Sequence, residues 1–203
     1  KDGTIQHLQA AGCQTVWVGA ESGSQRVLDA MEKGTTVEQI YQATRLLHQN
    51  GIQVGFFLQY GYPGETREDI DKTLSMVREC RPDEIGISVS YPLPGTRFYD
   101  RVMKEVQQKQ NWTDSGDLDM MFQGSYKPDF YRALHTLTHK KFRIWQARDI
   151  IKEIAANPTK TTRSSVLRIA KSVYHAVTLP SLGSRLDALA VRQKPHLNAG
   201  VRH

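Results

Sequence analysis

The sequence is poor in cysteine, with only Cys13 and Cys80, which stand far apart in the chain. Two such cysteines cannot build a disulfide framework, and by themselves they cannot form a metal site. We therefore predict two small buried side chains and a cytoplasmic protein. The chain also lacks an apolar run of about 18 residues or more, so no transmembrane helix is predicted.

Acidic residues nearly vanish after Pro158, where Asp187 is the only one left. The cations of this stretch are Lys160, Arg163, Arg168, Lys171, Arg185, Arg192, Lys194 and Arg202. Much of the net charge of +6 therefore lies in a basic tail. A solvated surface is the ordinary interpretation of such a tail, and binding to nucleic acid or anionic lipid is the alternative.

Three nearly continuous apolar runs predict β-strands over 15–20, 53–60 and 84–91. Runs of this kind are typical of parallel strands that are buried on both faces. Their spacing leaves room for a helix after each strand, which implies right-handed crossovers.

Capping boxes mark the start of two of the helices between these strands. Thr36 with Gln39 precedes one amphipathic run, and Thr66 with Asp69 precedes the next. The predicted fold class is therefore α/β. Because three strands cannot close a barrel, they form either the second half of one or one side of an open sheet.

All three strands end in turns rich in glycine or proline, "VGAESGSQR", "QYGYPGET" and "SYPLPGTRF". Such turns occur for geometry alone, but three in succession at one edge of a parallel sheet indicate a common ligand surface. Glu21 and Ser22 suit vicinal hydroxyls such as those of ribose. Gly64 precedes a helix N-terminus, where a phosphate can bind, but the sequence has neither GxxxxGK[ST] nor GxGxxG.

The stretches "VWVGAESGSQRVLDAMEKGTTVEQI", "GIQVGFFLQYGYPGET" and "PDEIGISVSYPLPGTRFYD" together resemble the later half of a radical S-adenosylmethionine (SAM) core domain. Within that superfamily the chain is most similar to proteins with a cobalamin-binding domain, of the anaerobic magnesium-protoporphyrin IX monomethyl ester cyclase type. The resemblance implies the second half of a (β/α)6 partial TIM-like barrel, strands four to six, followed by a helical C-terminal region.

The resemblance also implies a set of cofactor-binding residues at the three strand ends. These are Glu21, Ser22, Arg26, Gln59, Gly61, Pro63, Gly64, Tyr91 and Pro92. Glu21 would contact the SAM ribose and Arg26 the methionine carboxylate, while the second strand end lies against the adenosine and the third walls the adenine. Phe57 stands where some relatives carry Asp, which puts a second ribose contact there in doubt.

The sequence differs from the family in the motifs that bind its cofactors. It has no CxxxCxxC motif for a 4Fe–4S cluster and no DxHxxG cobalamin motif. We therefore expect the C-terminal piece of a longer enzyme, inactive alone, or else a degenerate remnant. The resemblance implies reductive SAM cleavage for cyclase or methyltransferase chemistry, with cobalamin as a further cofactor. The implied partners are the missing N-terminal half, a flavodoxin or ferredoxin reductant, and a small substrate such as a tetrapyrrole or lipid.

We predict three parts: a partial core over 1–105, a helical extension over 106–158 and a basic helical tail over 159–203. The tail allows membrane-surface contact, whereas nucleic acid is not the expected partner. Two alternatives remain open: a radical SAM methylthiotransferase acting on RNA, and a non-catalytic module that binds lipid or nucleic acid through its basic tail.

Two further groups of side chains have both a structural and a functional interpretation. His135 and His139 have the spacing of two metal ligands on a helix, but without HExxH a surface pair is favoured. Several aromatic side chains suit a large flat substrate, but core packing is favoured for most of them: Trp112, Phe122, Tyr126, Phe130 and Tyr131.

Overall fold

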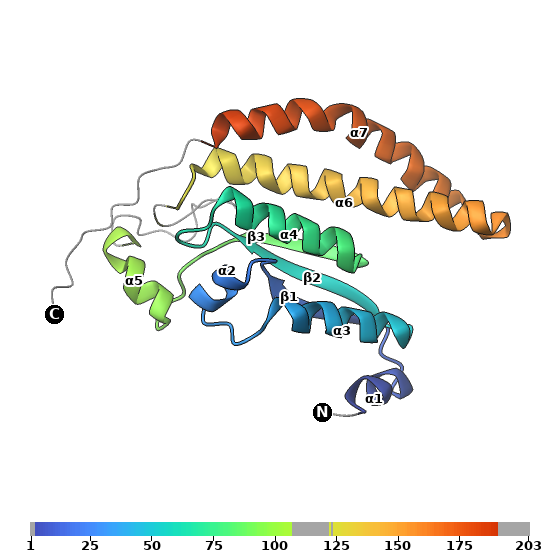
Figure 1. Ribbon diagram of the computed structural model, residues 1–203, viewed down its shortest axis with the longest axis horizontal. Coiled ribbons are helices and arrows are strands. Elements are labelled where there is room, and N and C mark those ends of the chain that lie inside the picture. Colours follow the sequence, from blue (N-terminus) through green and yellow to red (C-terminus); the bar gives the residue numbers. More distant parts are fainter. Residues whose placement is uncertain (1–2, 107–121, 123, 191–203) are drawn as a thin grey trace.

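The computed structural model describes residues 3–106, 122 and 124–190. Three strands and eight helices follow one another in this part of the chain (Figure 1). In order they are α1 Thr4–Ala10, β1 Thr15–Glu21, α2 Gln25–Ala30, α3 Val37–Gln49, β2 Gln53–Tyr60, α4 Arg67–Cys80, β3 Glu84–Val89, α5 Arg97–Val106, α6 Pro128–Ala156, the 3-10 turn η1 Pro158–Lys160 and α7 Arg163–Leu189. Within these residues no helix combines the length and apolar character needed to cross a membrane.

The strands form one parallel sheet in the order β1-β2-β3. Thr15 pairs with Gln53 at one end, and Tyr60 pairs with Val89 at the other. This order, with a helical connection between successive strands, confirms the α/β prediction and is that of one half of a (β/α)6 partial barrel.

Local sequence signals explain where the sheet's helices begin. In both predicted capping boxes, Thr36–Gln39 before α3 and Thr66–Asp69 before α4, the side chains and backbone N–H groups bond reciprocally. Each box satisfies two backbone donors that a helix leaves free in its first turn. At the other end of α4, Arg81 turns into the left-handed region with φ 51°, which stops the helix before Pro82.

The two faces of the sheet differ. One face packs against α3, α4 and α6 and buries Val54, Phe56, Leu58, Tyr60 and Ile85. On the other face Trp17 is 44% exposed and Phe57 is 51% exposed. The prediction of strands buried on both faces is therefore wrong, because three strands cannot curl far enough to cover their own concave side. We call this uncovered side the open face.

Helices α6 and α7 form a long antiparallel pair, with α6 against α4 and α7 as the outermost layer (Figure 1). Four of the singled-out aromatics, Phe122, Tyr126, Phe130 and Tyr131, belong to the core under these helices, which confirms core packing. Cys80 is buried and Cys13 is half-buried, and neither forms a disulfide. Trp112, Arg192, Lys194 and Arg202 lie outside the described residues, and the three-part division stays a prediction.

Candidate functional site

The carboxyl ends of the three strands meet at one edge of the sheet, as parallel pairing requires. Glu21 pairs with Leu58, and Tyr60 pairs with Val89. Just beyond the strands, Ser90 N–H donates to the Tyr60 carbonyl at 2.7 Å. The structure therefore brings the three predicted turns together.

Glu21 reaches the open face through a local irregularity of β1. The register shifts between Gly19 and Glu21, which leaves Ala20 as an extra residue, and Glu21 has φ 52°. This left-handed backbone is uncommon for a non-glycine residue. It brings the Glu21 carboxylate over Gly19, where a Cβ would lie 3.1 Å from Oε1. Lys33 Nζ donates to the same oxygen at 2.7 Å.

An aromatic shelf lies on the open face behind Glu21. The Trp17 and Phe57 rings stack with centroids 4.6 Å apart. The indole rests on Gly55, where a Cβ would lie 2.5 Å from the ring, and Phe57 lies close over Gly86. Glycine at these two positions lets both rings lie flat against the sheet. Phe57 therefore contributes stacking surface to the open face.

The turn between β2 and α4, residues 61–66, is the β2–α4 corner. Gly61 and Gly64 both have φ 83°, a conformation that favours glycine. Pro63 is exposed at the apex, and Gln59 is half-buried just before the corner. Glu65 closes the loop from within, because its Oε2 accepts from Gly61 N–H at 2.6 Å.

Burial makes Glu65 an unusual carboxyl group. Its side chain is almost entirely buried, and Oε1 has no hydrogen-bond partner among the described residues. Burial raises its pKa to about 8, while the bond from Gly61 N–H opposes the rise. Glu65 is therefore protonated over most of the neutral range.

Glu65→Gln is expected to change how stability depends on pH. Because the folded-state pKa of Glu65 is raised, its contribution is fully present below about pH 4.5 and is lost as pH rises through about 8. The free energy of unfolding of the Gln variant, minus that of wild type, should therefore grow by up to about 1.4 kcal/mol per pH unit in this window. Urea titrations from pH 5 to pH 9 measure this difference, with the exposed Glu68→Gln as control. Parallel pH profiles for wild type and Glu65→Gln would contradict the buried acid.

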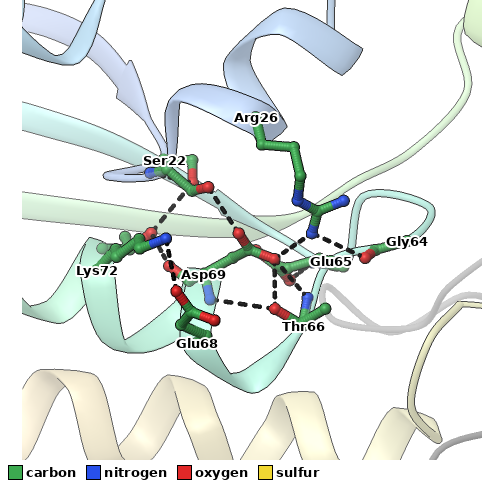
Figure 2. Close-up of polar contacts among 11 residues, drawn as sticks. Ser22, Arg26, Gly64, Glu65, Thr66, Glu68, Asp69 and Lys72 are labelled. Carbon is green, nitrogen blue, oxygen red and sulfur yellow. Dashed lines mark hydrogen bonds and ion pairs between the residues drawn. The ribbon is translucent and has the colours of Figure 1, made fainter.

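Asp69 joins the β1–α2 loop to the β2–α4 corner (Figure 2). Its Oδ1 accepts from Ser24 Oγ at 2.6 Å, and its Oδ2 accepts from both the N–H and the hydroxyl of Thr66, at 2.8 and 2.6 Å. Arg26 also donates to Oδ2. Burial alone would raise the pKa of Asp69, but these hydrogen bonds hold it well below its usual range. Asp69 therefore stays ionised at every physiological pH.

Ser22 faces α4 in this structure. Its hydroxyl is fully buried and lies 3.1 Å from Thr73 Oγ1, which also accepts from Gly23 N–H at 2.9 Å. A Cβ at Gly23 would lie 2.4 Å from the backbone oxygen of Lys72, so the loop and α4 touch backbone to backbone. The structure gives Ser22 a role in holding this loop, and its contact with a cofactor stays a prediction.

Arg26 crosses from α2 to the β2–α4 corner. Besides its ion pair with Asp69, it donates to the Gly64 carbonyl at 3.1 Å, and its side chain is more than half exposed. The guanidinium thus braces the corner and still borders solvent. The α4 N-terminus beside it carries a capping box and the acids Glu68 and Asp69 in its first turn, an arrangement that disfavours a phosphate there.

The corner also contacts the end of α2, because the Tyr62 hydroxyl donates to the Ala30 carbonyl at 2.6 Å. Just after α2, Glu32 accepts from Arg97 and Arg101 of α5, each at 2.7 Å. At the end of the third strand, the Tyr91 side chain is about half exposed and Pro92 is buried.

Sequence reasoning missed three residues of this network: Glu65, Thr73 and Ser24. The sequence identified Asp69 as a capping residue only. The "GYPGE" spacing was a signal for Glu65, since a glutamate four residues after a glycine in a tight turn can reach back to the N–H of that glycine. Nothing local to residue 73 could indicate that its hydroxyl meets the first strand end.

His135 and His139 lie side by side on α6, with ring centroids 4.6 Å apart and pKa values lowered by burial. Across the described ranges, no three histidine, cysteine, aspartate or glutamate side chains gather as a metal site would require.

Comparison with known proteins finds a family similarity in the N-terminal part of the chain. Residues 2–77 match the model of the Radical SAM superfamily. An uncharacterised methyltransferase of Pyrococcus horikoshii is 30% identical over 114 residues, 55% of this chain and 25% of that protein. The anaerobic magnesium-protoporphyrin IX monomethyl ester cyclase of Rubrivivax gelatinosus is 32% identical over 100 residues, 49% of this chain and 18% of that protein.

A longer alignment is found with a tRNA-2-methylthio-N(6)-dimethylallyladenosine synthase of Paraburkholderia phytofirmans. It is 25% identical over 181 residues, which cover 87% of this chain and 37% of the synthase. The matched region thus spans well under half the length of each of these relatives.

Proposed function

We propose that this chain is a member of the radical SAM superfamily and that the carboxyl edge of its sheet binds the adenosine part of SAM, within an enzyme of cyclase or methyltransferase type. The observation that carries the proposal is the Glu21 carboxylate, which an irregular strand end brings to the open face beside a corner with two left-handed glycines.

The residues present fit a nucleoside. A carboxylate accepts two hydrogen bonds from vicinal hydroxyls, so Glu21 would hold the ribose. Gly61 and Gly64 place no side chain at the corner, so a flat base can approach the backbone there. Tyr91 and Pro92 would wall the base from the third strand end, and Gln59 would offer it an amide. Arg26, braced by Asp69, would face the methionine carboxylate.

The 4Fe–4S cluster does not fit the residues of this chain. Cys13 lies before β1 and Cys80 ends α4, and the described residues contain no other cysteine. We propose that the cluster ligands come from another segment of a longer protein, of which this chain is the later half of the core. SAM bound at such a cluster would supply radical chemistry, and the part of this chain would be to hold and orient SAM and to keep water from it.

The remaining parts of the proposal rest on the family resemblance. They are a cytoplasmic setting, a flavodoxin- or ferredoxin-type reductant, cobalamin as a second cofactor and a small substrate of tetrapyrrole or lipid class. The likeness to the Rubrivivax cyclase supports a tetrapyrrole.

Methylthiolation of RNA is the second candidate, and the alignment over 87% of this chain favours it. The two candidates differ in substrate and not in the proposed SAM site. Incubating the reconstituted enzyme with unmodified tRNA, followed by mass spectrometry of the nucleosides, separates them.

The test of the SAM site uses the protein encoded by the whole gene, reconstituted with iron and sulfide without oxygen. Glu21→Gln is expected to weaken SAM binding at least about tenfold, because a charge-assisted hydrogen bond to the ribose is lost. Equilibrium dialysis with radiolabelled SAM measures the affinity, and release of 5′-deoxyadenosine measures turnover. Glu38→Gln, on the surface of α3, is the matched control.

Two results would count against this site. Unchanged affinity in Glu21→Gln would remove the ribose assignment, and absence of SAM binding by wild type would overturn the proposed function.

A further inference from the structure

The first half of α7 exposes an unusual number of apolar side chains. Each of the five is between 51% and 74% exposed: Val166, Leu167, Val173, Tyr174 and Val177. At about 100° per residue they lie within a single stripe roughly 120° wide along three turns of the helix. We call these five residues the outer stripe.

The opposite side of the same half is less apolar. The partly buried residues of this half include Ser165, Ile169 and Ser172. A surface helix of a globular protein normally turns its apolar residues inward and its polar residues outward. In this half of α7 the arrangement is reversed, and α7 is the outermost layer of the molecule (Figure 1). The outer stripe is therefore suited to contact with an apolar medium.

The charged side chains that α7 itself carries along the outer stripe are all of one sign. Between Glu153 and Asp187 the sequence contains no acidic residue. The cations in that interval are Lys160, Arg163, Arg168, Lys171 and Arg185. Lys140 of α6 adds another at the border of the stripe, with its ammonium 5.2 Å from the centre of the Tyr174 ring.

We propose that the outer stripe of α7 binds the surface of an anionic lipid membrane, with the helix lying in the plane of the headgroups. An exposed apolar stripe bordered by cations is the composition of an interfacial helix, in which apolar side chains enter the acyl boundary and cations meet lipid phosphates. Nucleic acid fits less well, because its phosphodiester backbone binds cations and makes no favourable contact with three exposed valines. This inference does not depend on the proposed SAM site.

The apolar contribution is tested by sedimentation of the protein with lipid vesicles. Wild type is expected to bind vesicles containing about one third phosphatidylglycerol and to bind pure phosphatidylcholine far more weakly. The double variant Leu167→Ser/Val177→Ser is expected to lose at least about tenfold in binding. Leu46→Ser, an exposed leucine on α3, is the control and should bind as wild type does.

The charge contribution is tested in the same assay. Arg163→Gln/Lys171→Gln is expected to weaken binding by roughly fivefold per cation, and added salt should reduce this difference. Arg45→Gln/Arg78→Gln removes two exposed charges elsewhere and serves as the matched control.

A gain-of-signal variant avoids the risk that serine destabilises α7. Val173→Trp places an indole in the outer stripe, and brominated lipids in the vesicles are expected to quench its fluorescence. Leu46→Trp should remain unquenched.

Three outcomes would overturn the proposal. The first is equal binding to the two kinds of vesicle, or none to either. The second is unchanged binding by the outer-stripe variants. The third is a dimer in lipid-free solution, seen by light scattering, that the same variants disrupt; it would assign the stripe to a second copy of the chain.

Discussion

Asp69→Ala is expected to lower the free energy of unfolding by about 3–5 kcal/mol. The substitution leaves the buried Ser24 hydroxyl and the Thr66 N–H without their acceptor, and it removes the capping box of α4. Arg26 contributes less to the loss, because its exposed guanidinium can turn to water. Urea unfolding followed by circular dichroism measures the change.

Two neighbouring substitutions make this prediction specific. Asp71→Ala removes an exposed carboxylate of the same helix, 3.8 Å from Arg67, and should cost less than about 0.5 kcal/mol. Asp69→Asn keeps an acceptor but loses the charge, so an intermediate loss is expected. If Asp69→Ala were no more destabilising than Asp71→Ala, Asp69 would not organise the two loops.

Gly23→Ala is expected to destabilise the chain by about 3 kcal/mol. Its Cβ would lie 2.4 Å from the Lys72 oxygen and 2.8 Å from the Thr73 Cα. Both are backbone atoms, so relief requires the β1–α2 loop to move away from α4. That movement would also break the hydrogen bond from Gly23 N–H to the Thr73 hydroxyl.

Gly183→Ala is the control, and its expected effect on the free energy of unfolding is opposite to that of Gly23→Ala. Nothing lies within 4 Å of a Cβ at Gly183 in α7, so Gly183→Ala should stabilise the helix by about 0.5–1 kcal/mol. Thermal melting of both variants measures the pair. A Gly23→Ala protein as stable as wild type would show that the loop and α4 are not in backbone contact.

Part of the candidate site could be predicted from the sequence, because its signals are local. The glycines of "YGYPGET" and the capping pair Thr66–Asp69 show a tight corner before a helix, and parallel strands bring it beside Glu21. The roles of Glu65 and Thr73 could not be predicted, because a buried carboxyl and a buried hydroxyl gain their partners only from packing.

The order of strands and helices could be predicted from the sequence alone, since hydrophobic runs and helix caps depend on neighbouring residues. Which sides of these elements are covered depends instead on how the elements pack together. This packing leaves Trp17 and Phe57 on an open face, turns the Glu21 carboxylate to that face through an irregular strand end, and directs the outer stripe of α7 away from the core. Each of these outcomes depends on contacts between residues distant in the chain, which no local pattern records.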